Sequence, residues 1–384
     1  MSNIRSAFIA STALALAATN AFSVRVRLDP STVLVVVNDS TPLEPGTGNK
    51  GASQYVADHY ASARKIPPGN IVHIRVPMGC CENDPKAWDS WTISWQSFKD
   101  NVRTPIKQFM ALKRLTSKIK YIVPTYGVPS HISRHPYGAT GLSVDAMLSI
   151  MSTRYADLYA LQNPLYNPDP DRMPHVTQKV FRSPFYFVSR LDGPSAQIAA
   201  GLVDKALDAE RGISRKSGVG YFDWQNRTPG DSYYVADQTM LSAYNLCVEA
   251  GMQCNLNDQS VAGGLIMNAP NTLWAWGWYS GGQVNDVYTF VPGAVGAQLT
   301  SYTAGSIRTP APGAWVPLWL ERGVTATWGA TSEPYVDRYT VGDCLLNRLW
   351  KGYTFAEAAY LATPYLGWTM VFVGDPLYSP RFID

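Results

Sequence analysis

Residues 33–37 read Val-Leu-Val-Val-Val, and residues 119–123 read Ile-Lys-Tyr-Ile-Val. Short β-branched runs of this kind are typical of strands that are buried on both faces. Between them, apolar residues recur at helical spacing in 51–65 and 95–117, and Ile71–Val76 is a further strand candidate. This order predicts a βαβαβ unit with right-handed crossovers and helices that cover a parallel sheet.

The second half of the chain repeats the alternation of strand and helix. Strands are expected at Phe185–Ser189, Val219–Phe222, Leu273–Trp276, Ala294–Thr300, Val324–Thr327 and Thr369–Val373. Helices are expected at Ser195–Glu210, Ala236–Ala250, Trp315–Glu321, Val341–Trp350 and Thr354–Ala362. Thr354 and Glu357 have the spacing of a capping box. The sequence therefore predicts an α/β fold, a mostly parallel sheet flanked by helices on both faces.

The domain organisation follows from composition. Residues 1–23 have the layout of a secretory signal peptide: Arg5, an apolar run over 7–18, and small residues before Val24. Residues 154–182 are rich in Asn, Pro and Asp and are expected to form a loop. This loop separates an N-terminal α/β lobe at 24–153 from a C-terminal α/β lobe at 183–384, which form either two fused lobes or one large sheet.

Charge and cysteine content narrow the classes of function. Lysine and arginine number 32 against 29 acidic residues, a net charge of +3, and only 16% of residues are charged. Such a composition lacks the basic surface of a nucleic-acid-binding protein. We expect an exported, soluble protein without a transmembrane segment in the mature chain, and no cofactor.

The five cysteines are Cys80, Cys81, Cys247, Cys254 and Cys344. In an exported chain Cys247 and Cys254 could close a small loop as a disulfide, or all five could be buried thiols. The spacing of zinc-binding cysteines is absent from the sequence, so we predict no metal site.

Candidate functional residues were sought just after each expected strand, because ligands of open parallel sheets bind at the carboxyl ends of the strands. Arg190 and Asp192 are the pair of candidates with the most specific chemistry. An arginine there can hold a carboxylate or phosphate through two hydrogen bonds, with a nearby aspartate setting its orientation. The alternative is a structural ion pair, with Asp192 and Pro194 starting the next helix.

Three further carboxylates are candidates. Asp145 lies in the first turn of a helix that Ser143 could cap, where a structural role is sufficient. Glu333 precedes Pro334, so its backbone is extended and its side chain could face a cleft. Asp375 lies between glycine and proline, and is either a ligand-facing acid or a turn former.

Histidine and aromatic residues complete the set. His131 and His135 follow an expected strand, and a general base would be one of these two. No histidine follows His175 in the sequence. Aromatic residues near strand ends could stack on sugars or grip apolar peptides, although helix–sheet packing is the alternative for each. Those included as candidate ligand-binding residues are Tyr126, Trp278, Tyr279 and Tyr335.

Several motifs together resemble those of a family of exported bacterial proteins for which catalytic residues are not established. They are Thr125-Tyr-Gly-Val-Pro129, Ser143-Val-Asp145, Ser189-Arg-Leu-Asp-Gly-Pro194, Gly220-Tyr-Phe-Asp223, Gly277-Trp-Tyr-Ser280, Ser332-Glu-Pro-Tyr335 and Gly374-Asp-Pro-Leu-Tyr378. This resemblance implies membership but no activity. One difference is Gln298, where that family tends to have a histidine.

The segment Leu273–Tyr378 is also similar, more distantly, to gingipain-type peptidases of the caspase-like fold. That similarity implies a caspase-like sandwich and a His-Gly and a Cys after successive strands. Gly277-Trp278 stands near the first of these positions, and Ser301 and Thr303 stand near the second. Both members of the catalytic dyad are therefore missing at the matching positions.

Three hypotheses of function follow. The first is a non-proteolytic binding protein that holds a small molecule, glycan or peptide in a strand-end cleft around Arg190, Asp192, Trp278, Tyr279 and Glu333. The second is a hydrolase that uses Asp145, Asp192, Glu333 or His131 as acid and base. The third is a structural component of the cell surface, which would expose a large apolar patch.

Overall fold

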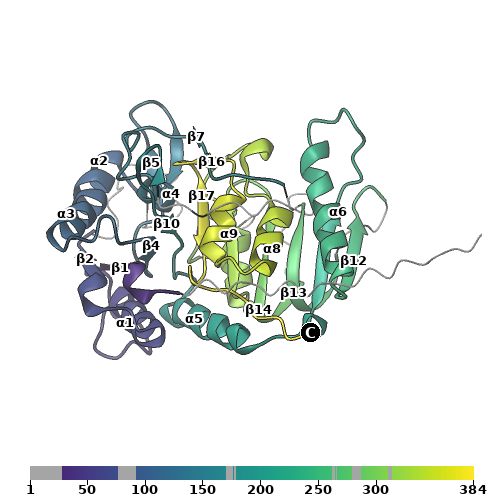
Figure 1. The fold of residues 1–384 in the computed structure, drawn as a ribbon, viewed down its shortest axis with the longest axis horizontal. Helices are drawn as coiled ribbons and strands as arrows, with labels where there is room; N and C mark the ends of the chain where they lie inside the picture. Colours follow the sequence, from purple (N-terminus) through teal and green to yellow (C-terminus); the bar gives the residue numbers. More distant parts are fainter. Residues whose placement is uncertain are drawn as a thin grey trace, which may run out of the picture.

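The computed structural model describes residues 28–76, 92–169, 176, 179–261, 264, 266–278, 287–309 and 314–384. The expected signal peptide, Cys80, Cys81 and Tyr279 lie outside the described residues. Two main sheets, of four and six strands, carry the helices of the described chain, and three small sheets lie beside them (Figure 1).

The first sheet contains four parallel strands in the order β10-β4-β1-β2. Its members are β1 (Val33–Asn38), β2 (Ile71–Ile74), β4 (Tyr121–Pro124) and β10 (Phe187–Val188). Every residue of β1 is buried, as its β-branched sequence predicts for a central strand.

The second sheet contains six strands in the order β12-β11-β13-β14-β15-β17. They are β11 (Val219–Trp224), β12 (Gln253–Asp258), β13 (Ala269–Trp278), β14 (Tyr288–Leu299), β15 (Ala326–Ala330) and β17 (Met370–Val373). The first five in this order run parallel to one another, whereas β17 pairs with β15 antiparallel.

Arg190 joins the two sheets through its backbone. Its N–H donates to the carbonyl of Phe372 (2.9 Å) and its carbonyl accepts from Gly374 (2.9 Å). These contacts form a parallel bridge between Arg190 and Val373 at the end of β17. Because β10 is parallel to β17, the whole first sheet runs opposite to the five parallel strands of the second.

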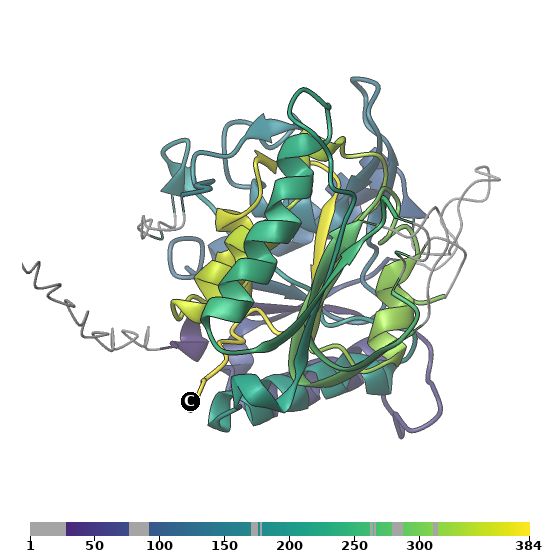
Figure 2. The same ribbon diagram turned by 90° about the vertical axis from the view of Figure 1, so that its right-hand side faces the viewer.

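Helices cover both faces of the second sheet. On one face lie α6 (Tyr234–Glu249), α8 (Gly342–Trp350) and α9 (Phe355–Leu361), and on the other lies α7 (Trp315–Glu321), while α5 (Ala196–Arg211) runs across below the strands in this view (Figure 2). The side chain of Trp276 of β13 points to the first of these faces, since its indole N–H donates to Thr239 of α6 (3.0 Å). Trp319 of α7 packs on Tyr288 of β14 at 4.9 Å between ring centroids and defines the second.

The first sheet has its own helices. α1 (Ala52–Arg64) packs on β1 and on α5, and α3 (Thr104–Leu112) packs beside β2. α3 continues a helical segment made of α2 (Trp95–Ser97) and the π-helical turn η3 (Phe98–Arg103). Figure 1 shows α1 and α3 on opposite sides of this sheet.

Short elements complete the described chain. α4 (Val144–Ser149) packs against β10 and β17 at the junction of the sheets. The short strands are β3 (Thr92–Ile93), β5 (His131–Arg134), β6 (Thr140–Ser143), β7 (Leu161–Gln162), β8 (Lys179–Val180), β9 (Ser183–Pro184) and β16 (Tyr365–Leu366). The 3-10 turns are η1 (Pro30–Thr32), η2 (Pro68–Asn70), η4 (Arg215–Ser217) and η5 (Val336–Arg338).

The α/β prediction is confirmed, because mostly parallel sheets carry helices on both faces. The capping box is also confirmed: Thr354 accepts from the Glu357 N–H, and the Glu357 side chain accepts from Thr354. β12 is not among the expected strands, because its polar and partly exposed sequence lacks an apolar run. Among the described residues, no helix combines the length and apolar character needed to span a bilayer.

Candidate functional site

An open cleft of about 720 Å³ lies where β11, β13, β14 and β15 end. Four segments line it: residues 225–233 after β11, Trp278 at the end of β13, residues 299–301 after β14, and residues 333–339 after β15. We call it the strand-end cleft. It lies at the edge of the second sheet where ligands of parallel sheets are expected, and it contains the predicted residues Trp278, Glu333 and Tyr335.

Trp278 is held rigidly at one wall of the cleft. Its indole N–H donates to Asp237 Oδ1 of α6 (2.8 Å), and the ring of Tyr233 packs edge-on against it at 5.8 Å. The fully buried Asp237 carboxylate also accepts the backbone N–H groups of Gln225 (2.7 Å) and Arg227 (2.8 Å). One carboxylate therefore fixes both the tryptophan and the loop that follows β11.

Glu333 and Tyr335 form the opposite wall. Glu333 Oε1 accepts the backbone N–H of Tyr335 (2.9 Å), and its Oε2 accepts the hydroxyl of Ser301. Tyr335 has φ of 59°, a left-handed backbone that is costly for a residue with a side chain and concentrates at functional sites. Its side chain remains 58% exposed, and the Arg338 guanidinium lies 5.5 Å from its ring centroid.

The chemistry of the lining is that of a binding site. Tyr233 and Tyr335 present aromatic faces to solvent, and Glu333, Ser301 and Gln225 supply hydrogen-bonding groups. No histidine or cysteine occurs among the described residues that line the cleft. The nucleophile–base pair of a cysteine or serine peptidase is therefore not assembled from these residues.

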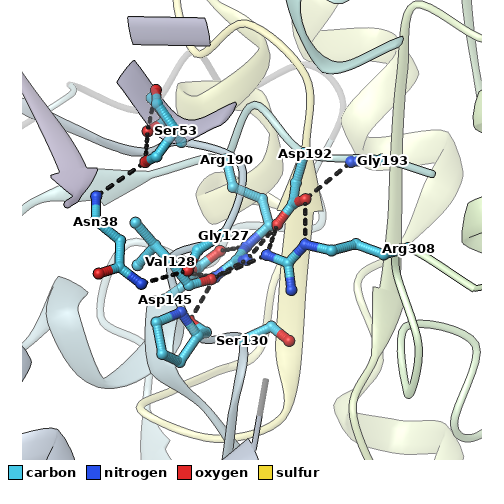
Figure 3. A network of polar contacts seen from close by, with 12 residues as sticks. Asn38, Ser53, Gly127, Val128, Ser130, Asp145, Arg190, Asp192, Gly193 and Arg308 are labelled. Carbon is cyan, nitrogen blue, oxygen red and sulfur yellow. Dashed lines mark hydrogen bonds and ion pairs between the residues drawn. The ribbon is translucent and has the colours of Figure 1, made fainter. Parts of the chain in front are cut away.

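Arg190, Asp145 and Asp192 lie together in a fully buried network at the junction of the sheets (Figure 3). Arg190 donates to both oxygens of Asp145 (2.8 and 2.7 Å) and to Asp192 Oδ2 (2.7 Å). It also donates to the carbonyls of Val128 (3.1 Å) and Pro129 (3.0 Å). These contacts use all five N–H groups of the guanidinium, so none is left for a ligand.

A second arginine closes this network. Arg308 Nε donates to Asp192 Oδ1 (2.9 Å), which also accepts the backbone N–H of Gly193 (2.9 Å). Burial alone would lower the pKa of Arg190, but the charges of Asp145 and Asp192 raise it above its ordinary value. The geometry matches the structural ion pair considered from the sequence, with two carboxylates instead of one.

The other predicted residues lie outside the strand-end cleft. Tyr126 is buried beneath the Arg308 guanidinium (5.2 Å to the ring centroid), and His131 Nδ1 lies 2.9 Å from the hydroxyl of Ser130. Asp375 is fully buried and accepts from Tyr60 (3.2 Å) and Arg64 Nε (2.6 Å).

Strand direction explains this division. The expectation that all strand ends share one edge requires a single strand direction. β17 is antiparallel to β15, and β4 and β10 follow the direction of β17. The segments that follow β4, β10 and β17 therefore start at the opposite edge from the cleft, and Tyr126, Asp192 and Asp375 belong to these segments.

Arg227 and Tyr233 line the cleft, and the buried Asp237 holds Trp278 in its wall, but the sequence analysis did not select these three residues. Arg227 and Tyr233 lie five or more residues beyond the expected strand end at Phe222, whereas only Asp223 was considered there. Asp237 lies in the first turn of an expected helix, where an acidic residue is ordinarily explained by the helix dipole. A search that extended further past the end of each expected strand would have included Arg227 and Tyr233.

Asp223 itself is buried behind the cleft at the end of β11. Its Oδ1 accepts from Asn257 (3.1 Å). Gly277 leaves room for it, because a Cβ at that position would lie 2.4 Å from the Asp223 Cβ. Burial raises the pKa of Asp223 to about 7.

Comparisons with known proteins return distant structural similarity alone. No protein-family model matches the chain, and no curated protein matches it. It is similar to the crystal structure of the Arg-specific cysteine proteinase gingipain R (TM-score 0.42, 11% identity, 93% of this chain and 80% of that chain). The complex of Porphyromonas gingivalis RgpB pro- and mature domains has the same TM-score and identity, covering 91% and 79%.

A structure described as a protease is similar at TM-score 0.42 and 13% identity, covering 91% of this chain and 78% of that chain. The first two are gingipain structures, the peptidase type to which the segment Leu273–Tyr378 is similar. At such low identity and TM-score, the similarity carries no conclusion about activity.

Removing Arg190 should destabilise the fold. In Arg190→Ala, Asp145 and Asp192 lose their buried partner, and we expect the free energy of unfolding in urea to fall by about 3–5 kcal/mol. The control is Arg211→Ala, whose ion pair with Asp208 is exposed and should contribute no more than about 1 kcal/mol. Equal stability of both variants would contradict a structural role for the network.

Asp223 should make stability depend on pH. A carboxyl whose pKa is raised from 3.8 to about 7 binds its proton more tightly in the folded state, so stability falls as pH rises from about 4 to 7 and then levels. Asp223→Asn has no carboxyl at this position, so it lacks this pH-dependent contribution to stability. The difference in unfolding free energy between the two proteins should change by about 4 kcal/mol between pH 4 and pH 8. A constant difference over that range would refute the shift.

Proposed function

We propose that this protein is a non-proteolytic ligand-binding protein whose binding site is the strand-end cleft. The observation that carries the proposal is the convergence of Trp278, Tyr233, Tyr335 and Glu333 on one cavity from three separate segments. Its volume lies within the range of about 300–1,000 Å³ that small-molecule sites occupy. Aromatic walls with a few oriented polar groups are the usual composition of such sites.

Preorganisation supports this assignment. Asp237 fixes the wall formed by Trp278 and the loop after β11, and the Glu333 contact holds Tyr335 in its left-handed backbone. Groups that are already ordered lose less entropy when a ligand binds. In contrast, Arg190, Asp145 and Asp192 have structural roles in this proposal, because their donors and acceptors are engaged with one another.

The walls can be tested by substitution. Tyr335→Ala and Glu333→Gln should each weaken binding of a ligand found with the unmodified protein by about tenfold, since an aromatic contact contributes about 0.5–1.5 kcal/mol. The measurement is the ligand-dependent shift in Tm across a panel of sugars and peptides, followed by calorimetry of the hits.

Matched controls are Tyr137→Ala and Glu249→Gln, which alter exposed residues outside the cleft lining. Both should bind as the unmodified protein does. If Tyr335→Ala and Glu333→Gln also leave the affinity for every hit unchanged, the ligand binds elsewhere and the proposal is wrong.

We also propose that the chain is exported, on the layout of residues 1–23, and that Cys247 and Cys254 become linked in that compartment. Cys247 lies in the last turns of α6 and Cys254 in β12, across a short turn, and both thiols are free in this structure. A hydrogen bond from Cys247 lowers the pKa of the Cys254 thiol, which favours the reactive thiolate.

Protein purified without reductant from the exported compartment should contain a disulfide between Cys247 and Cys254. Two thiols lose two protons and two electrons to a disulfide donor of that compartment. Peptide mapping after alkylation should recover the linked pair, with Cys344 alkylated as the free, buried control once the protein is unfolded. Alkylation of both Cys247 and Cys254 would show that the pair stays reduced.

A further inference from the structure

A second hollow adjoins the strand-end cleft. It has a volume of about 470 Å³, and its lining consists of polar side chains. We call it the polar pocket; it includes Asn226, Thr228, Asp231, Gln259 and Ser260. Gln225 and Arg227 line both the pocket and the cleft, so these two residues form the wall between them.

Arg227 is held in that wall by hydrogen bonds that use only some of its N–H donors. Its Nε and Nη2 donate to Gln225 Oε1 (3.0 and 2.6 Å), and its Nη1 donates to Asp231 (3.1 Å). Its guanidinium also lies 5.7 Å from the ring centroid of Tyr233. Hydrogen bonds to described residues use three of its five N–H groups, and its side chain is 37% exposed. Two donors are therefore available to a ligand that passes from cleft to pocket.

The lining suits a molecule rich in hydroxyl groups. Carboxylates and amide oxygens of Asp231, Glu333 and Gln259 accept hydrogen bonds, while Arg227 donates them. The exposed aromatic faces of the cleft can stack on the apolar C–H face of a sugar ring. A saccharide can use the hydrogen-bond donors, the acceptors and the aromatic faces of this lining at the same time.

Charge favours a neutral saccharide over an acidic one. Asp231 pairs with Arg227 and neutralises it, and across the cleft Glu333 carries a further negative charge. An anionic ligand would meet repulsion from Glu333 without an uncompensated cation among these residues to attract it.

Strand pairing favours a saccharide over an extended peptide. β11, β13, β14 and β15 end at the cleft, and each of them is already paired on both sides. A peptide that adds to a sheet needs an unpaired strand edge, which these four strands do not offer. Recognition at their ends must use side chains and faces instead of a backbone ladder.

We propose that the ligand of the cleft is a neutral oligosaccharide that spans both compartments. One sugar ring stacks between the aromatic walls of the strand-end cleft, and the next ring occupies the polar pocket, hydrogen-bonded to Arg227 at the wall between them. This inference rests on the proposed function, since it names the class of ligand for the same cleft.

The first experiment is an array of neutral and acidic oligosaccharides with basic, acidic and apolar peptides. The neutral saccharide that binds best is then titrated calorimetrically as a series of one to four sugar units. We expect neutral saccharides as the hits and affinity that rises at least about tenfold between one unit and two, as the second ring enters the polar pocket.

The second experiment blocks the polar pocket alone. Ser260 is exposed at its rim, so Ser260→Trp should fill the pocket without disturbing the core and abolish the gain from the second sugar unit, leaving one-unit binding unchanged. Ser217→Trp, at an exposed serine of η4 outside both cavities, is the matched control and should keep the full gain. Arg227→Lys keeps the positive charge but removes the planar guanidinium with its several N–H donors. It should reduce the gain in affinity from the second sugar unit.

The outcomes separate this inference from the proposed function. If Tyr335→Ala weakens the hits, but they are peptides or acidic sugars, or their affinity does not rise with length, the cleft binds a ligand and the oligosaccharide inference is wrong. If Ser260→Trp keeps the length dependence, the second ring is not in the polar pocket. If Tyr335→Ala leaves every hit unchanged, or if the array yields no hit, both proposals are contradicted.

Discussion

The buried contact of Arg190 with Asp145 and Asp192 is the constraint on which the arrangement of the two sheets depends. Its backbone bridges β17, and its side chain binds α4 and the loop after β4. A guanidinium in a dry interior is strongly unfavourable unless it is paired and hydrogen-bonded. The sheets can therefore meet only in the register that brings both carboxylates to this arginine.

This junction also determines where a ligand can bind. Because the first sheet continues from β17, it runs opposite to the parallel strands β11, β13, β14 and β15. Asp192 and Asp375, which follow β10 and β17, are used at the other edge in buried contacts with Arg190 and Arg64. The strand ends of the second sheet, in contrast, bring exposed aromatic and acidic side chains together in one cleft.

The local secondary structure could be predicted from the sequence, whereas the edge of the sheet at which each strand ends could not. β-branched runs, amphipathic spacing and the Thr354 capping box are signals within a few residues, and the corresponding elements are present. The direction of β17 depends on which strand it joins, and its sequence, apolar throughout, is compatible with either direction. Of the candidate residues at strand ends, Trp278 and Glu333 therefore line the cleft, whereas Asp375 lies buried at the other edge.

Two arginines show why residue type alone could not separate structure from function. Arg190 and Arg227 both follow strands and both lie beside aspartates. The first is fully buried with five donors engaged, so its chemistry ends within the protein. The second keeps a partly exposed fork between two cavities, because Gln225 and Asp231 hold it from one side alone. Burial, which depends on the meeting of distant segments, decides which of two similar sequence patterns faces a ligand.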